Sequence, residues 1–184
     1  MEHIAELGNE VPAEPVIFIK PNSSIASEIY FDKTDAIQYE AEITFLLNSG
    51  KLSGVGFGLD LTKRAVQSVL KEKGLPWERA KAFDGAAVFS EFVSFEGCVD
   101  DLTIELSIND CVVQRGQCRQ MISKPECLLT EVGSFLSFEN GDLLMTGTPR
   151  GVGAVKQADR FAGKIFEKQQ LLVQCAWLVQ PRNR

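Results

Sequence analysis

Three acidic side chains, Glu40, Glu42 and Asp60, are the residues of this sequence best suited to hold a metal ion. Glu40 and Glu42 stand two apart in a stretch that predicts a strand, so their side chains point to one face, roughly 7 Å apart along the backbone. Asp60 follows the glycine-rich stretch 54–58. Three carboxylates converging from neighbouring strands offer the hard oxygen ligands that Mg²⁺ or Mn²⁺ prefers, with positions left for water or substrate.

The spacing also permits a simpler interpretation. Residues 39–47 alternate, with apolar side chains at odd positions, so Glu40 and Glu42 would lie on the solvated face of a half-buried strand. Asp60 would then cap the segment that follows it. Spacing alone favours this solvated strand, and the metal hypothesis depends on the rest of the sequence.

Composition indicates an ordinary globular protein. A chain of 184 residues with 45% hydrophobic content is long enough for one domain with its own core. The net charge is −6 and no basic stripe indicates nucleic-acid binding. No apolar run reaches the roughly 18 residues of a membrane span, and the beginning of the sequence lacks the basic and long apolar regions of a signal peptide. Five scattered cysteines without a C-x-x-C pair predict reduced thiols in a cytoplasmic protein, not a zinc site or a disulfide framework.

The expected secondary structure is mostly short strands. Helices are predicted at 61–73, with Gly74 and Pro76 beyond its end, and within 125–137, from Glu126 to about Gly133 or Phe138. Asn109-Asp110 predicts a hairpin turn. Strands are predicted at 16–20, 39–47, 52–59, 102–108, 111–114, 143–145 and 171–179. Regular β-α alternation is absent, so we expect an α+β fold dominated by mixed sheets, with few helices.

The segment 146–153 (TGTPRGVG) is a glycine-rich loop after a predicted strand. It has neither the Gly-Lys-Ser/Thr ending of a P-loop nor the G-x-G-x-x-G spacing of a dinucleotide site. Its glycines permit positive φ angles, and such a loop can direct backbone N–H groups and the Thr148 hydroxyl at an anion.

Taken in order, these features resemble the fumarylacetoacetate hydrolase family, and within it the small acylpyruvase and oxaloacetate decarboxylase or tautomerase type. The matching stretches run almost from end to end: 18–21 (FIKP), 39–42 (YEAE), 59–67 (LDLTKRAVQ), 73–77 (KGLPW), 80–84 (AKAFD) and 141–153 (GDLLMTGTPRGVG). The resemblance implies one catalytic domain over 1–184, with a β-roll or half-barrel of mixed sheets.

The resemblance also implies roles for individual residues. Glu40, Glu42 and Asp60 would ligate one Mg²⁺ or Mn²⁺. Five further side chains would hold the carboxylate and keto groups of the substrate: Lys20, Arg64, Gln67, Lys81 and Thr148. Lys81 would also be catalytic. By position alone, Arg64 and Gln67 would be solvated helix residues and Lys81 an ordinary surface lysine.

His3, the single histidine of the chain, and Glu6 match the His-x-x-Glu dyad of the family. One helical turn places the carboxylate beside the imidazole, so Glu6 would orient His3 as a general base on water. We expect residues 1–12 to form a lid that begins inside the motif of the family. A lone histidine near a terminus is otherwise usually exposed and idle.

The implied chemistry is metal-assisted enolate formation from a 2-oxo acid. It would give C–C bond hydrolysis of an acylpyruvate, decarboxylation of oxaloacetate, or keto-enol tautomerisation. Two alternatives stay open: an isomerase or hydratase of aromatic catabolism with the same metal site, and a lapsed member that binds metal and dimerises without turnover. A homodimer is expected, with the apolar residues between 83 and 95 near the interface because they would otherwise form an exposed patch.

Overall fold

The computed structural model describes residues 14–33 and 35–182 of the chain. Two sheets hold the longer strands: a six-stranded sheet in the order β1-β7-β5-β4-β11 with β8 beside β5, and a four-stranded sheet in the order β10-β9-β13-β14. Smaller sheets pair β12-β3-β6 and β15-β2.

The described part of the chain contains the following elements. The strands are β1 (Ile25–Ala26), β2 (Tyr30–Phe31), β3 (Ile37–Tyr39), β4 (Ala41–Asn48), β5 (Lys51–Asp60), β6 (Thr62–Lys63), β7 (Ala87–Phe89), β8 (Val93–Ser94), β9 (Leu102–Ile108), β10 (Cys111–Gln117), β11 (Leu143–Met145), β12 (Gly153–Ala154), β13 (Arg160–Glu167), β14 (Gln170–Leu178) and β15 (Gln180–Pro181). The α-helices are α2 (Arg64–Glu72), α3 (Glu78–Lys81) and α4 (Pro125–Gly133), and short 3-10 turns cover Asn22–Ser24, Val99–Asp101 and Cys118–Gln120.

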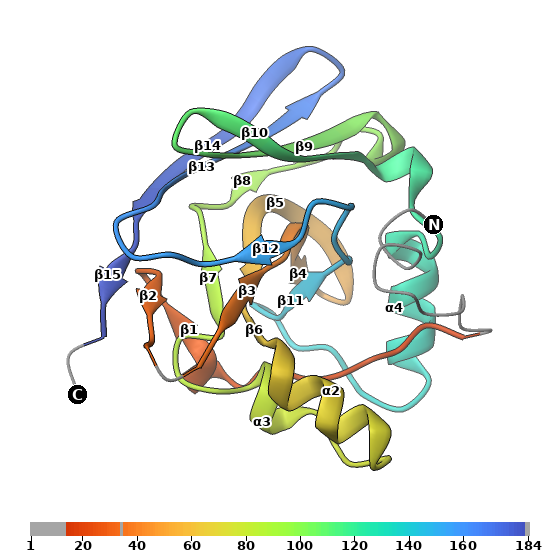
Figure 1. The fold of residues 1–184 in the computed structure, drawn as a ribbon. Coiled ribbons are helices and arrows are strands. Elements are labelled where there is room, and N and C mark those ends of the chain that lie inside the picture. Colours follow the sequence, from red (N-terminus) through yellow and green to blue (C-terminus); the bar gives the residue numbers. More distant parts are fainter. Residues whose placement is uncertain (1–13, 34, 183–184) are drawn as a thin grey trace.

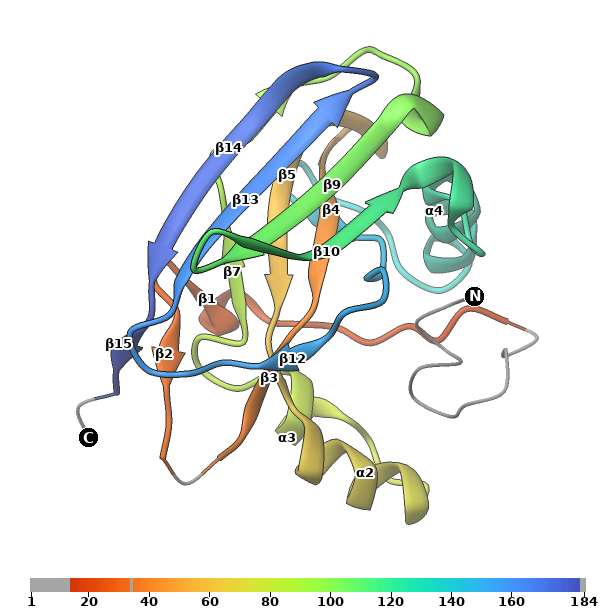
Figure 2. The same cartoon turned by 45° about the horizontal axis from the view of Figure 1, so that its top comes forward.

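The four-stranded sheet lies across the six-stranded sheet, and the helices lie at the periphery (Figure 1). Strands β9, β13 and β14 run side by side across β4 and β5 (Figure 2). Helices α2 and α3 occupy one end of the molecule and α4 one side (Figure 1). The predicted α+β class, with mixed sheets and few helices, is confirmed, and the sheets do not close into a barrel.

Aromatic side chains fill the space between the two large sheets. Phe57 of β5 is fully buried beneath β13, where a Cβ added at Gly163 would lie 2.8 Å from its ring. Gly163 therefore lets the ring of Phe57 approach the backbone of the facing sheet. Tyr39 meets Phe161 edge to face, with ring centroids 5.3 Å apart, an arrangement that aromatic pairs prefer. The core is continuous from one sheet to the other.

Most of the predicted elements are present. The hairpin at Asn109-Asp110 is confirmed, with both residues at positive φ (49° and 66°). The helix predicted at 61–73 begins only at Arg64, because Thr62 and Lys63 pair with β3 as a short strand. The second predicted helix ends at Gly133, the earlier of the two ends that the sequence left open. The strand expected at 16–20 is wrong: prolines bracket this segment, and Val16 and Ile19 are 54% and 57% exposed.

Strand β13 was not predicted. Its residues alternate in burial as a strand should, but Ala162 and Gly163 dilute the apolar signal around Phe161 and Ile165.

The apolar residues between 83 and 95 do not form an exposed patch. Val88 and Phe95 are buried at 0% and 7% exposure. The others are partly buried, namely Phe83, Phe89, Phe92 and Val93. The chain itself covers part of this run, so the exposed apolar area is smaller than expected, and the place of a dimer interface stays a prediction. Homodimer formation remains a prediction.

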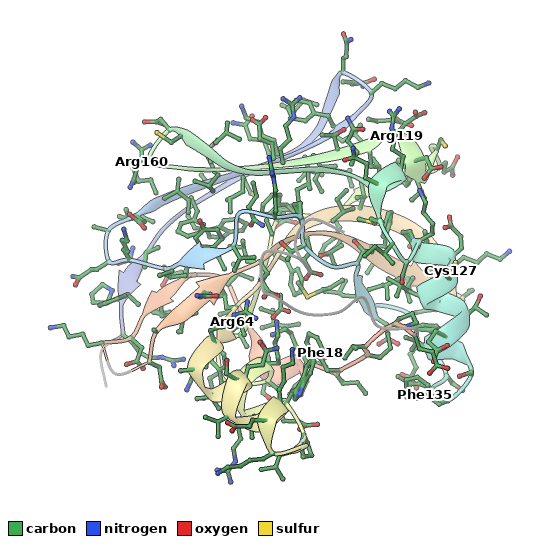
Figure 3. All side chains as sticks on the ribbon, turned by 45° about the vertical axis from the view of Figure 1, so that its right-hand side comes forward. Phe18, Arg64, Arg119, Cys127, Phe135 and Arg160 are labelled. Atoms are coloured by element: carbon green, nitrogen blue, oxygen red, sulfur yellow. The ribbon has the colours of Figure 1, made fainter. Side chains whose placement is uncertain are left out.

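The cysteines are free in the structure. Cys127 is exposed on α4 (Figure 3), and Cys118 is buried. Burial raises the pKa of the Cys118 thiol to about 12 and makes it a poor nucleophile. Across the described residues, no helix combines the length and the apolar character that crossing a bilayer requires.

Candidate metal centre and active site

The three acidic residues meet in the interior. Glu40, Glu42 and Asp60 are 6%, 5% and 2% exposed. One carboxylate oxygen from each lies within 4.8 Å of the other two. Glu40 occupies the break between β3 and β4, where its carbonyl accepts from the N–H of Asp60 at 2.8 Å. That bond joins the start of β4 to the end of β5, which brings the third carboxylate to the first two.

The solvated-strand interpretation is therefore wrong. Strand β4 is buried on both faces over Ala41–Phe45, because one face meets the core and the other meets the polar cluster. Asp60 is not a helix cap either: it ends β5, and Lys63 precedes the first residue of α2.

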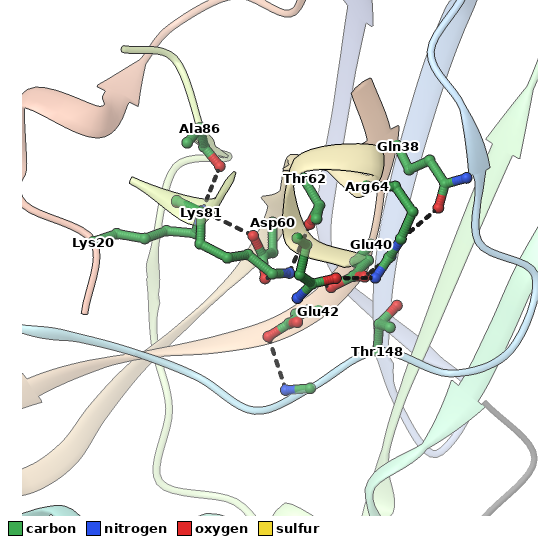
Figure 4. Close-up of polar contacts among 12 residues, drawn as sticks. Lys20, Gln38, Glu40, Glu42, Asp60, Thr62, Arg64, Lys81, Ala86 and Thr148 are labelled. Atoms are coloured by element: carbon green, nitrogen blue, oxygen red, sulfur yellow. Dashed lines mark hydrogen bonds and ion pairs between the residues drawn. The ribbon is translucent and has the colours of Figure 1, made fainter. Parts of the chain in front are cut away.

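Lys81 places its ammonium group between two of the carboxylates (Figure 4). Its Nζ lies 2.8 Å from Glu40 Oε2, 2.6 Å from Asp60 Oδ2 and 2.6 Å from Thr62 Oγ1. An ammonium has three protons, so these bonds use all of them. Lys81 comes from α3, a short helix that was not predicted, and at 2% exposure it is no surface lysine.

Lys20 contacts the other carboxylate oxygen of Asp60. Its Nζ lies 2.8 Å from Asp60 Oδ1 and donates to the carbonyl of Ala86 at 2.9 Å and to that of Lys81. The contact with Oδ1 is a close ion pair, although its angle is not that of a good hydrogen bond and Oδ1 has no other partner among the described residues. Lys20 thus compensates the charge of Asp60 and, through the carbonyl of Lys81, links α3 to the end of β5.

Arg64, the first residue of α2, extends along the polar cluster. Its Nη2 pairs with Glu40 Oε1, its Nη1 donates to Gln67 Oε1 at 2.6 Å, and its Nε donates to Gln38 Oε1 at 2.7 Å. Gln67 and Leu70 are 6% and 8% exposed, whereas Val69 is 47% exposed. Helix α2 therefore buries a polar residue, Gln67, together with the apolar Leu70.

The glycine-rich loop closes the remaining side of the cluster. The N–H of Gly147 donates to Glu42 Oε2 at 2.8 Å, and Gly147 has a φ of 91°. The Thr148 hydroxyl donates to the carbonyl of Ala41 at 2.9 Å and accepts from Gln114. In this arrangement the Thr148 proton is used on Ala41, so the hydroxyl could donate to a substrate oxygen only by exchanging that bond for one to the substrate.

The two glutamates experience opposite electrostatic environments. For Glu40, burial alone would raise the pKa, but the charges of Lys81 and Arg64 outweigh it and lower the pKa to about 2. For Glu42, burial and the charges of Asp60 and Glu40 raise the pKa to about 8. Among the described residues no cation pairs with Glu42, and the Gly147 N–H is its hydrogen-bond donor.

The other charged groups of the cluster are also perturbed. Burial raises the pKa of Asp60 despite its contacts with Lys81 and Lys20. Burial lowers the pKa of Lys20. For Lys81, burial acts in the same direction, but the nearby charges of Asp60 and Glu40 raise the pKa overall.

This donor set fits a divalent cation. A buried carboxylate without a counterion is costly, and Glu42 is in that state beside two further carboxylates. All three donors are oxygens, the ligands that hard divalent cations prefer. A bound cation would supply the positive counter-charge that Glu42 lacks. It would also compete with the Lys81 ammonium for the carboxylates of Glu40 and Asp60.

The predicted lid dyad cannot be placed. His3 and Glu6 lie outside the described residues, so their role as a general base pair stays a prediction.

Comparison with known proteins gives this site a context. The sequence model described as the fumarylacetoacetate (FAA) hydrolase C-terminal region matches residues 1–174. The chain belongs to the fumarylacetoacetate hydrolase family. An oxaloacetate tautomerase of Escherichia coli (strain K12) is 35% identical over 176 residues, which covers 86% of this chain and 80% of that protein. A mitochondrial oxaloacetate decarboxylase of Dictyostelium discoideum is 36% identical over 84% of this chain and 79% of its own length.

Solved structures of the family share this fold. The crystal structure of fumarylpyruvate hydrolase from Pseudomonas aeruginosa, in complex with Mn²⁺ and pyruvate, superposes with a TM-score of 0.88 at 26% identity. The match covers 98% of this chain and 85% of that chain. That neighbour was therefore solved with a divalent metal and a 2-oxo acid.

Three polar residues that contact the site had no predicted role. Gln38 accepts from Arg64, and Thr62 accepts from Lys81. Gln38 stands two residues before Glu40, so strand periodicity could have placed it on the same face. Gln114 binds both Ala41 and the glycine-rich loop. It comes from a distant strand, and no local pattern points to it.

Proposed function

We propose that this chain is a divalent-metal-dependent enzyme acting on 2-oxo acids, and that tautomerisation or decarboxylation of oxaloacetate is the chemistry its described residues support best. The observation that carries the proposal is the buried cluster of Glu40, Glu42 and Asp60 with Arg64 at its edge. Relatives named for oxaloacetate tautomerisation and decarboxylation support the choice of substrate.

Charge balance favours a dianionic substrate. The cluster contains three carboxylates and three cationic side chains. The carboxylates are those of Glu40, Glu42 and Asp60, and the cations are Lys20, Arg64 and Lys81. A divalent cation added to this set leaves an excess of positive charge. Oxaloacetate, with two carboxylates, would offset that excess in a site where the low dielectric strengthens every charge interaction.

Each side chain has a task that follows from its contacts. Arg64 has five N–H groups and its three contacts engage three, so the others can bind a substrate carboxylate. Gln67 holds the Arg64 guanidinium in place. Lys81 has no proton left to donate in this arrangement, so it stabilises a developing enolate by its charge. When bound, the divalent ion would supply Lewis-acid stabilisation of the enolate oxygen.

Enolate formation suffices for two reactions. Transfer of a proton from C3 of oxaloacetate to a base gives an enolate, and protonation of its oxygen gives the enol. Loss of the C4 carboxylate as CO₂ gives the enolate of pyruvate. Neither reaction needs an activated water. The described residues therefore account for stabilisation of the enolate in both reactions without a lid, whereas tautomerisation needs in addition a base that takes the C3 proton.

Hydrolysis of an acylpyruvate is the second candidate. It is supported by the spacing of His3 and Glu6 and by the likeness to fumarylpyruvate hydrolase. In this reaction His3 would act as general base on water, with Glu6 orienting its imidazole.

The test is a substrate panel with metal control. Protein freed of metal with EDTA and then supplied with Mg²⁺ or Mn²⁺ is assayed with oxaloacetate, acetylpyruvate and an aromatic-pathway isomerase substrate, with spontaneous decay subtracted. We expect metal-dependent conversion of oxaloacetate, which Asp60→Asn abolishes. Turnover of the isomerase substrate alone would support the aromatic-catabolism alternative. Mn²⁺ binding without turnover of any substrate would support the lapsed member.

Three finer points belong to the same proposal. The physiological ion is Mg²⁺ or Mn²⁺, given an all-oxygen donor set. The protein is a homodimer, which sedimentation at micromolar concentration tests. It resides in the cytoplasm, since its five cysteines are free, as in a reducing compartment.

A further inference from the structure

Gln114 is a buried glutamine on an otherwise largely exposed strand. It is 2% exposed, while its neighbours Val112 and Arg115 on β10 are exposed. The pairing of β10 with β9 is irregular between Val112 and Gln114, so Val113 is an extra residue in the ladder. Such a bulge re-aims the side chain that follows it, and bulges recur beside active sites. Here the bulge turns an amide group into the protein.

The amide of Gln114 connects two segments of the site. Its Oε1 accepts from the backbone N–H of Ala41 at 3.0 Å. Its Nε2 donates to Thr148 Oγ1 at 2.9 Å and to the carbonyl of Pro149 at 2.8 Å. The same nitrogen lies 3.5 Å from the carbonyl of Arg150. Both Nε2 protons and one Oε1 lone pair are therefore used on the predicted metal-ligand strand and the glycine-rich loop.

The two segments that Gln114 joins both affect the position of the Glu42 side chain. Ala41 stands between Glu40 and Glu42, so holding its N–H fixes the backbone from which both carboxylates project. The loop supplies the Gly147 N–H that binds Glu42 Oε2 at 2.8 Å.

Packing shows independently that the loop rests on β10. A Cβ at Gly151 would lie 2.1 Å from the carbonyl oxygen of Val113, and Gly151 has a φ of 100°. A Cβ at Gly116 would lie 2.8 Å from Pro149 Cβ. Glycine on both sides of the contact allows the loop to approach the strand, and Gln114 lies at its centre.

We propose that Gln114 is a positioning residue that fixes the loop 147–151 against the start of β4 and thereby orients Glu42 for metal binding and Thr148 for the substrate. This inference rests on the proposed function. Gln114 would not touch the metal or the substrate, and it would act through Ala41, Gly147 and Thr148. Mutation of residues that orient metal ligands through hydrogen bonds typically weakens metal affinity 10–100-fold.

The experiment compares two variants at position 114 with a matched control. Gln114→Met keeps the shape and removes every hydrogen bond. Gln114→Glu keeps the acceptor for Ala41 but presents an oxygen to the oxygens of Thr148 and Pro149. Gln117→Met makes the same chemical change three residues along β10. Mn²⁺ affinity is measured by electron paramagnetic resonance, and amide hydrogen exchange of 147–151 is measured without metal, at temperatures where circular dichroism shows folded protein.

We expect both Gln114 variants to bind Mn²⁺ 10–100-fold more weakly and to exchange the loop amides at least tenfold faster. Where turnover is measurable, KM for oxaloacetate should rise more than kcat falls, since Thr148 is displaced. Gln117→Met should match the parent in all three readouts.

Several results would overturn the proposal. Mn²⁺ affinity and loop exchange within twofold of the parent in both Gln114 variants would show that the amide positions nothing. Failure of both variants to fold would assign Gln114 to stability alone. If the parent itself binds no Mn²⁺, the proposed function fails, while loop exchange in metal-free protein still decides the role of Gln114.

Discussion

Replacing Glu42 by glutamine should stabilise the metal-free protein and weaken its metal binding. In the folded chain the pKa of Glu42 is about 8, against an ordinary value of 4.5. Between these values the folded chain retains a proton that the unfolded chain has released, so stability falls as pH rises. From about pH 5.5 to about pH 8 the loss is roughly 3 kcal/mol, at about 1.36 kcal/mol per unit.

Glu42→Gln removes this loss because an amide does not ionise. Its oxygen can still accept from Gly147, and its NH₂ group can donate to Glu40 or Asp60. Relative to the parent, the variant should therefore gain roughly 3 kcal/mol of unfolding free energy between pH 5.5 and pH 8.

Glu40→Gln is the matched control, two residues away on the same chain segment. The pKa of Glu40 is lowered to about 2 because Lys81 and Arg64 hold its charge. Its ionised form contributes stability above about pH 4.5, which is lost as pH falls toward 2. Glu40→Gln should therefore destabilise the metal-free protein at pH 8, opposite in sign to Glu42→Gln.

The assay is urea unfolding in EDTA at the two pH values, followed by Mn²⁺ titration. Mn²⁺ should stabilise the parent by mass action and stabilise Glu42→Gln far less. If Glu42→Gln lowers the stability of the metal-free protein at pH 8 as much as Glu40→Gln does, the electrostatic reasoning is refuted. Equal Mn²⁺ affinity in the parent and Glu42→Gln would place the metal elsewhere.

Three further predictions concern the lid, the substrate cation and the core. His3→Ala should depress acetylpyruvate hydrolysis by about 10²–10⁴-fold and leave oxaloacetate turnover near that of the parent, and full hydrolase activity in a kinetic assay would exclude the dyad from catalysis. Arg64→Lys should raise KM for oxaloacetate by at least about tenfold, because a lysine cannot keep the contacts with Gln67 and Glu40 while binding a carboxylate bidentately, and an unchanged KM would contradict that role. Gly163→Ala should lower the free energy of unfolding by about 1–3 kcal/mol, since its Cβ would lie 2.8 Å from the Phe57 ring, and denaturation curves that coincide with those of the parent would contradict the close packing of the two sheets.

Local pattern determined the elements that carry the predicted metal ligands. The alternation through 39–47 and the turn residues Asn109-Asp110 act between neighbours in the chain, and both appear in the structure as strand and hairpin. The motif order identified the family, and the two-residue spacing placed Glu40 and Glu42 close together. The strand at 16–20 failed because a strand needs a partner, which no local pattern can guarantee.

Only the tertiary structure decided what surrounds the carboxylates. Glu40, Glu42 and Gln67 are polar positions that local spacing alone assigned to solvent, yet all three are buried. Their burial follows from the cover that α2, α3 and the loop 146–153 provide, and periodicity reports which face is polar but not what packs against it. Gln114 is the clearest case: it is 73 residues from Ala41 along the chain, and only the crossing of the two sheets brings its amide to that N–H. The opposite pKa shifts of two glutamates two residues apart have the same origin, because the cations that lower one of them come from α2 and α3.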